Sequence, residues 1–66
     1  MEPLYYVMNE TDGVLAWPEP MTRGESDEFM IEFRQRFARQ GYYLTSGGQR
    51  IPVSEVRFKR IPEAEL

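Results

Sequence analysis

The sequence predicts a small α+β domain in which one amphipathic helix packs on one face of an antiparallel sheet of about four strands, in the order β-β-α-β-β. Three aromatic residues, Phe29, Phe33 and Phe37, recur at a spacing of four, which places them along one side of a helix. Short runs rich in tyrosine and valine come before and after that helix and are bounded by glycine and proline. With 66 residues, the chain is expected to form a single domain over residues 1–66.

Two strands are expected before the helix. Residues 4–8 form the first, because tyrosine and valine favour a pleated surface. Asp12 and Gly13 predict a type I′ hairpin turn, whose two central positions both need positive φ. Residues 14–17 form the second strand, and Pro18 ends it because proline lacks the N–H that a ladder needs.

The helix is predicted over residues 26–40. Ser26 is the expected N-cap, and Thr22 with Glu25 is a competing capping box that would start the helix earlier. Gly41 is expected to end the helix in the left-handed conformation. The aromatic stripe should pack on Leu15, Trp17, Val56 and Phe58, together with one alternation of Leu4, Tyr6 and Met8.

The rest of the chain is predicted to return to the sheet. Strands are expected over residues 42–45 and 56–61, with a brief pairing over 49–51, and residues 62–66 form a frayed tail. Gly47 and Gly48 lie between strands, whereas phosphate-binding glycine loops require a helix after the glycines. They are therefore interpreted as a tight turn.

The composition excludes several functional classes. The chain has no cysteine and no histidine, so it lacks the commonest catalytic base and nucleophile and the ligands of zinc fingers. Glu28 and Glu32 are expected on a solvated helix face opposite the aromatic stripe, where carboxylates do little acid–base work. We expect no enzyme activity, cofactor, metal or small-molecule substrate.

The net charge of −3 disfavours a general nucleic-acid binder. The charges are nevertheless segregated along the chain, since residues 2–32 carry eight acids and one base, and residues 34–60 carry seven bases and one acid. No stretch has the length and hydropathy of a membrane span or a secretory signal, so a cytoplasmic location is expected.

One face of the predicted sheet has no helix to cover it. Aromatic residues should occupy this open face with positive charges at its edge, and soluble monomers rarely expose large apolar patches. The sequence therefore predicts a protein-binding surface that recognises a partner or a second copy as a homodimer. An alternative is single-stranded nucleic-acid binding by the same face. The predicted contact residues are Tyr5, Tyr43, Arg57, Lys59 and Arg50.

The compact, acidic α+β character without cysteine or histidine resembles that of many small phage or mobile-element proteins. That resemblance is one of composition and implies binding to, and inhibition of, a host protein.

Overall fold

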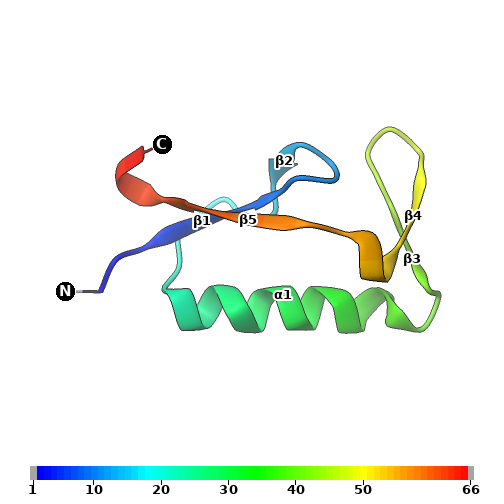
Figure 1. Ribbon diagram of the computed structural model, residues 1–66, viewed down its shortest axis with the longest axis horizontal. Coiled ribbons are helices and arrows are strands. Elements are labelled where there is room, and N and C mark those ends of the chain that lie inside the picture. The colour runs from blue at the N-terminus through cyan, green and yellow to red at the C-terminus, as the bar shows by residue number, and fades with distance from the viewer. Residues whose placement is uncertain (1, 66) are drawn as a thin grey trace.

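The computed structural model describes residues 2–65 and consists of one helix beneath a sheet, with a separate hairpin at one end (Figure 1). The predicted α+β class is confirmed, and the strands divide between two antiparallel sheets. One sheet has the strand order β2-β1-β5 and the other pairs β3 with β4. The strands are β1 (Tyr5–Asn9), β2 (Val14–Leu15), β3 (Tyr42–Leu44), β4 (Arg50–Pro52) and β5 (Phe58–Pro62). The helices are α1 (Arg23–Ala38) and the 3₁₀ turns η1 (Val53–Glu55) and η2 (Glu63–Glu65).

The helix begins at the earlier of the two predicted positions. Thr22 is the N-cap, and it forms a complete capping box with Glu25: the Thr22 N–H donates to Glu25 Oε1 at 2.8 Å, and the Glu25 N–H donates to Thr22 Oγ1 at 3.2 Å. The prediction that Ser26 caps the helix is wrong. The capping box satisfies two backbone N–H groups at the start of the helix. The free energy gained in this way exceeds the modest loss of helix propensity caused by Gly24 in the first turn.

Glycines make the turns where the sequence places them. Gly13, Gly41 and Gly48 have φ values of 72°, 85° and 84°, and the Gly48 N–H donates to the Thr45 carbonyl at 2.9 Å. Asp12 does not share this conformation, since no non-glycine residue among those described has positive φ. The type I′ assignment for the first hairpin is therefore wrong, and its loop covers the four residues between Asn9 and Val14.

The core lies between α1 and the three-stranded sheet. Phe58 of β5 packs edge-on against Phe33 and Phe29, with ring centroids 5.0 and 6.5 Å away. Val7 and Val56 are fully buried, with 0 and 2 % of their surfaces exposed. These contacts confirm the predicted aromatic stripe as the apolar side of the helix.

Polar contacts join the same two layers. Ser26 is completely buried, and its hydroxyl donates to the Arg23 carbonyl at 2.6 Å and accepts from Arg60 Nε at 2.7 Å. Arg60 of β5 also forms an ion pair with Asp27. About two turns further along α1, Arg34 Nη2 donates to the Val56 carbonyl at 3.1 Å. These bonds attach the helix to β5 along one side.

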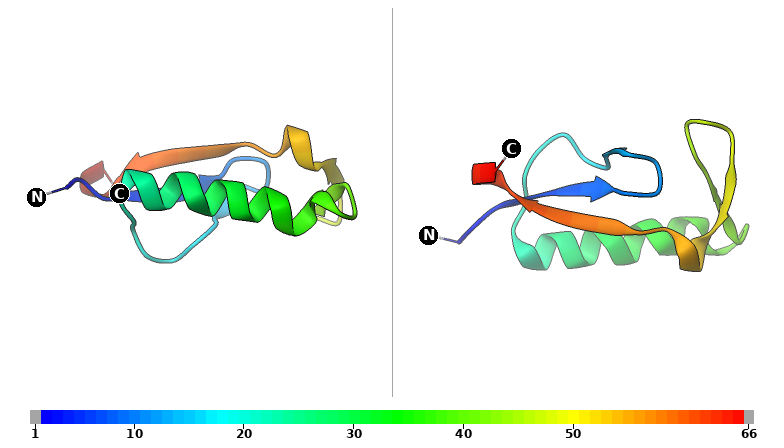
Figure 2. Two further views of the ribbon diagram at one scale, coloured as in Figure 1. Left: turned by 90° about the horizontal axis from the view of Figure 1, so that it is seen from below. Right: turned by 45° about the horizontal axis from the view of Figure 1, so that its top comes forward.

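The three-stranded sheet and the β3–β4 hairpin follow one another along the helix, so the molecule is elongated, with extents of 39 × 21 × 16 Å (Figures 1 and 2). The segment from Trp17 to Met21 loops out beside α1, on the side opposite β5 (Figure 2). In the predicted tail, Glu63 donates its N–H to the Leu4 carbonyl at 2.9 Å, whereas Leu66 lies outside the described residues.

Candidate functional site

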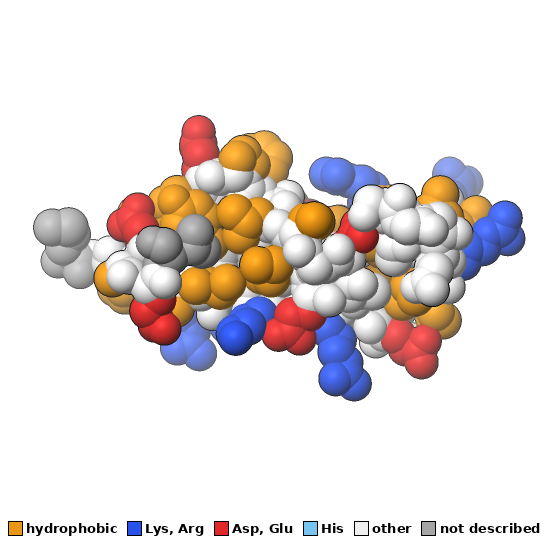
Figure 3. All heavy atoms as spheres, turned by 90° about the horizontal axis from the view of Figure 1, so that it is seen from above, with side chains coloured by type: hydrophobic (Ala, Val, Ile, Leu, Met, Phe, Trp, Pro, Cys, Tyr) orange, Lys and Arg blue, Asp and Glu red, His pale blue; other side chains and the backbone are white. Residues whose placement is uncertain are grey.

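Strand register decides which side chains the sheet presents away from the helix. Tyr5, Val7 and Asn9 of β1 pair with Pro62, Arg60 and Phe58 of β5, and these residues face α1. The alternate residues lie on the opposite side, which we call the outer face. The outer face consists of Leu4, Tyr6, Met8, Leu15, Lys59 and Ile61. Figure 3 shows hydrophobic side chains gathered over this side of the sheet.

Charged residues stand at the two ends of the outer face. The Glu10 N–H donates to the Arg57 carbonyl, so these residues continue the ladder beyond Asn9 and share the face of Lys59. At the other end, Glu63 pairs with Leu4 in the same way. One end therefore carries the cations of Arg57 and Lys59 together with the carboxylate of Glu10, and the carboxylate of Glu63 lies toward the other end.

The expected position of Tyr5 on the open face is wrong. Tyr5 alternates with the buried Val7 and Asn9, and its backbone exchanges two 2.8 Å hydrogen bonds with Met21. The inward register is tied to the turn, because buried Asn9 accepts the Asp12 N–H through Oδ1 at 3.1 Å. Tyr6 is consequently the tyrosine of this strand on the outer face, together with Met8, Leu4 and Leu15, which were expected against the helix.

The expected position of Tyr43 on the open face is also wrong. Its ring lies 5.3 Å from both Phe33 and Phe37, on the aromatic side of α1. Its hydroxyl donates to Asp12 Oδ2 at 2.7 Å, which links the β3–β4 hairpin to the first turn. The reason is that β3 is not part of the larger sheet and closes the end of the core instead.

The contact with Asp12 affects both ionisable groups. Desolvation, followed by the hydrogen bond to Asp12, raises the pKa of Tyr43 to about 12. The hydrogen bonds that Asp12 accepts from the Ser46 hydroxyl and from Tyr43 lower the pKa of its carboxyl group. The arrangement stabilises the charged carboxylate of Asp12 next to the neutral phenol of Tyr43. Its role is structural, because it links the first turn to the β3–β4 hairpin.

The predicted cations lie in two different places. Lys59 and Arg57 are exposed on the outer face, and the Arg57 N–H is held by Thr11 Oγ1 at 2.9 Å. Arg50 lies on the β3–β4 hairpin, where its guanidinium covers the Tyr42 ring at 4.9 Å. Of the five predicted contact residues, the structure thus places Arg57 and Lys59 together on the face opposite the helix.

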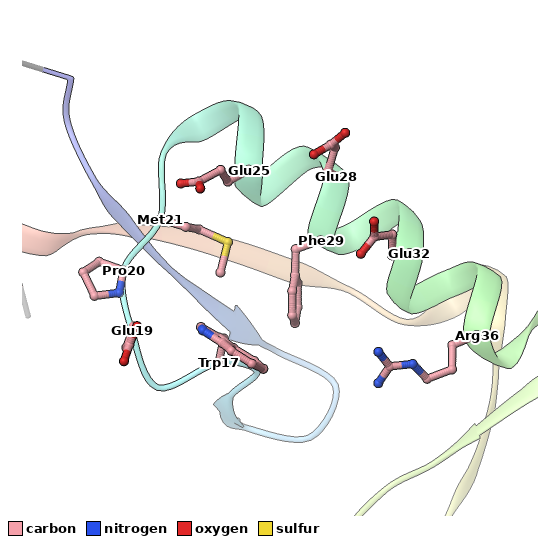
Figure 4. Close-up of a pocket in the computed structure, with 9 residues that line it drawn as sticks. All are labelled: Trp17, Glu19, Pro20, Met21, Glu25, Glu28, Phe29, Glu32 and Arg36. Carbon is pink, nitrogen blue, oxygen red and sulfur yellow. The ribbon is translucent and has the colours of Figure 1, made fainter.

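A concave feature lies on the helix side of the sheet, between α1 and the segment from Trp17 to Met21. It is an open groove of about 440 Å³. Trp17, Met21 and Phe29 provide its apolar surface, while Glu28 and Glu32 stand along its helix wall (Figure 4). Glu28 and Glu32 are exposed, as expected, but they flank the aromatic stripe and do not lie opposite it.

Sequence reasoning missed this groove for a specific reason. Trp17 was expected in a strand, but the chain leaves the sheet after Ala16 and rejoins β1 at Met21. Pro18 and Pro20 lie in the segment between them. Both prolines had been interpreted as the end of the second strand, because proline cannot continue a central strand. No local pattern indicated that Trp17 itself would turn toward the helix.

Within residues 2–65, no helix could cross a membrane and no three acidic side chains converge as metal ligands. No family model, curated protein or solved structure matches the chain.

Proposed function

We propose that this chain is a non-enzymatic protein-interaction domain and that its outer face pairs with the outer face of a second copy. The observation that carries the proposal is the outer face itself: apolar side chains of β1, β2 and β5 lie on the side of the sheet opposite α1 (Figures 1 and 3). Leu15 is exposed there, and Leu4, Tyr6, Met8 and Ile61 are half-buried. Uncovered apolar surfaces of this kind mark contact sites in soluble proteins.

The dimensions of the molecule favour a second copy. Its accessible surface is 4924 Å², whereas a compact monomer of this mass exposes about 4,400 Å². Its radius of gyration is 12.3 Å, compared with about 11 Å for a compact chain of this length. A dimer that buried an area equal to this excess, about 500 Å² on each copy, would bury about 1,000 Å² in total, the lower limit of a specific interface. We therefore expect a weak dimer with a micromolar dissociation constant.

The charges of the outer face are complementary to themselves. When two faces pack with their strands antiparallel, the end of one copy that carries Arg57 and Lys59 lies over the Glu63 end of the other. A two-fold axis repeats this contact on both sides of the apolar centre formed by Tyr6 and Met8. Each contact is at the solvated rim, so it orients the copies and adds little affinity.

Pairing through the free edge of β5 is less favourable. The N–H and C=O groups of Lys59 and Ile61 point toward β1 in the ladder, so those of Phe58 and Arg60 point toward the free edge of the sheet. Edge pairing of two copies centred on Lys59 would oppose two like charges, and pairing centred on Arg60 would do the same. Lysine and proline on an edge strand are a common protection against such pairing, and Pro62 completes it here.

The nucleic-acid alternative receives less support from this geometry. A single-strand platform needs several aromatic rings on one exposed surface. Tyr5 faces the helix, Tyr43 lies in the core and Tyr42 is covered by Arg50, which leaves Tyr6 as the tyrosine of the outer face.

Sedimentation velocity over about 1–500 µM protein tests the proposal, since this range brackets a micromolar equilibrium. The wild type should increase from 7.8 kDa toward twice that mass. Met8→Lys, at the centre of the outer face, should remain monomeric at every concentration. Ile31→Lys is the matched control, because Ile31 is an exposed residue of α1 remote from this face, and it should dimerise like the wild type.

Circular dichroism of each variant verifies that the fold is retained. A wild type that stays at 7.8 kDa throughout would overturn the proposal. The same holds if Met8→Lys dimerises normally, or if Ile31→Lys abolishes the dimer.

A further inference from the structure

The groove beside α1 presents an aromatic surface to solvent inside a concave site. Half of the surface of Trp17 is exposed, at 50 %. Its ring packs at a tilt of 59° on Phe29, with centroids 6.2 Å apart. Figure 4 shows the two rings between the loop and the helix, with Met21 beside them. A solvent-exposed indole held by a second ring is a rigid contact surface with little entropy left to lose on binding.

Carboxylates surround these rings. Glu19 lies on the loop wall, and Glu25, Glu28 and Glu32 lie on the helix wall. Arg36 follows them along the helix and extends its guanidinium toward the groove (Figure 4). Arg60 and Asp27 form an ion pair on the other side of the helix. Among the described residues, no side chain forms an ion pair with the carboxylates of the groove. The lining of the groove therefore carries four carboxylates and one guanidinium, so its net charge is negative.

We propose that this groove binds a basic segment of another protein, with an arginine or lysine side chain seated over the Trp17 ring. The face of an indole attracts a cation within about 6 Å of its centroid. The aliphatic stem of such a side chain would pack on Met21 and Phe29 while its charged end reaches Glu28 and Glu32. Both parts of the groove, the aromatic surface and the carboxylates, match this one class of ligand.

The proposal does not rest on the pairing of outer faces. The groove lies on the helix side of the sheet and the outer face on the opposite side, so a dimer would leave two grooves open. Anionic ligands, including nucleic-acid phosphates, are repelled by the carboxylate walls.

The single tryptophan of the chain is Trp17, so intrinsic fluorescence reports on this groove directly. The probe is an acetylated and amidated tetra-arginine peptide, titrated at low salt into about 1 µM protein, a concentration below the expected dimer equilibrium. We expect a saturable change in Trp17 emission that weakens with salt. A tetra-glutamate peptide should give no saturable change.

Two double variants with equal charge change separate specific from general attraction. E28Q/E32Q removes the helix wall and should weaken binding about tenfold, as two partly exposed ion pairs are lost. E10Q/E55Q removes two exposed carboxylates outside the groove and should change affinity less than about twofold. Arg36→Gln should strengthen binding about twofold, because it removes a like charge from the far end.

Equal weakening by E28Q/E32Q and E10Q/E55Q would overturn the proposal, because it would show attraction to net charge alone. The absence of any saturable emission change with tetra-arginine would overturn it as well, because the proposed cation lies on the fluorescent ring. Circular dichroism of both double variants verifies folding, and all four substituted glutamates are exposed.

Discussion

The bond between Ser26 and Arg60 predicts a measurable loss of stability in Ser26→Ala. Ser26 is fully buried, and its hydroxyl accepts from Arg60 Nε at 2.7 Å. A hydrogen bond to a charged group contributes about 1.5–3 kcal/mol. The Arg60 side chain is 28 % exposed, so water partly replaces the lost acceptor and the lower part of that range applies. Alanine regains about 0.5 kcal/mol of helix propensity. The net loss expected is about 1 kcal/mol.

Thermal unfolding followed by circular dichroism measures this loss. In a domain of this size, about 1 kcal/mol lowers Tm by about 4–8 °C. Ser54→Ala is the matched control, since Ser54 lies exposed in η1 and should leave Tm unchanged. An S26A variant as stable as the wild type would show that the buried hydroxyl does not hold β5 to the helix, and the reasoning would fail.

Three further predictions concern the turns and the outer face. Tyr43 should ionise at about pH 12, as measured by NMR from the chemical shift of its ring carbon. The stability linked to this raised pKa should be present below pH 10 and lost as the pH rises toward 12. Asp12→Asn should bring that midpoint down. The folded pKa of Asp12 lies below 3.8, so its contribution to stability is present above that pH and is lost as the pH falls further. The free energy of unfolding of Asp12→Asn in urea should therefore vary less with pH than that of the wild type between about pH 4 and 2. Lys59→Glu should weaken the dimer about two- to fivefold in sedimentation, and adding Glu63→Lys should restore it; a double variant weaker than the single one would exclude the antiparallel arrangement.

The helix and turns were predictable because local chemistry determines them. The spacing of Phe29, Phe33 and Phe37 identified the apolar side of α1, and the contact of Phe33 with Phe58 followed from it. Gly41 and Gly48 adopt the conformation that glycine alone tolerates well. The start of the helix required a choice between two caps, and the capping box of Thr22 decides it.

Sidedness was less predictable, because a one-residue change of register exchanges the two faces of a strand. The alternation of Leu4, Tyr6 and Met8 is the more hydrophobic one and was expected inside. The structure instead buries Val7 and Asn9, because the Asn9 side chain is needed to close the turn. The apolar alternation then lies half-buried on the side opposite α1, which is why the outer face exists.

The position of Tyr43 depended on topology that no local pattern contains. Its strand could have extended the main sheet, but β3 pairs with β4 and closes the core at the end of α1. The groove depended in the same way on the path of the chain after Leu15. Two of the five predicted contact residues, Arg57 and Lys59, remain on the proposed surface.

The most direct test is to map where self-association occurs. Amide chemical shifts of the ¹⁵N-labelled wild type would be compared at about 10 µM and 1 mM, concentrations on either side of a micromolar equilibrium. We predict concentration-dependent shifts centred on Tyr6, Met8 and Ile61, with α1 residues such as Ile31 unchanged. Spectra that are identical at both concentrations, or shifts centred on the helix, would contradict an interaction domain that works through its outer face.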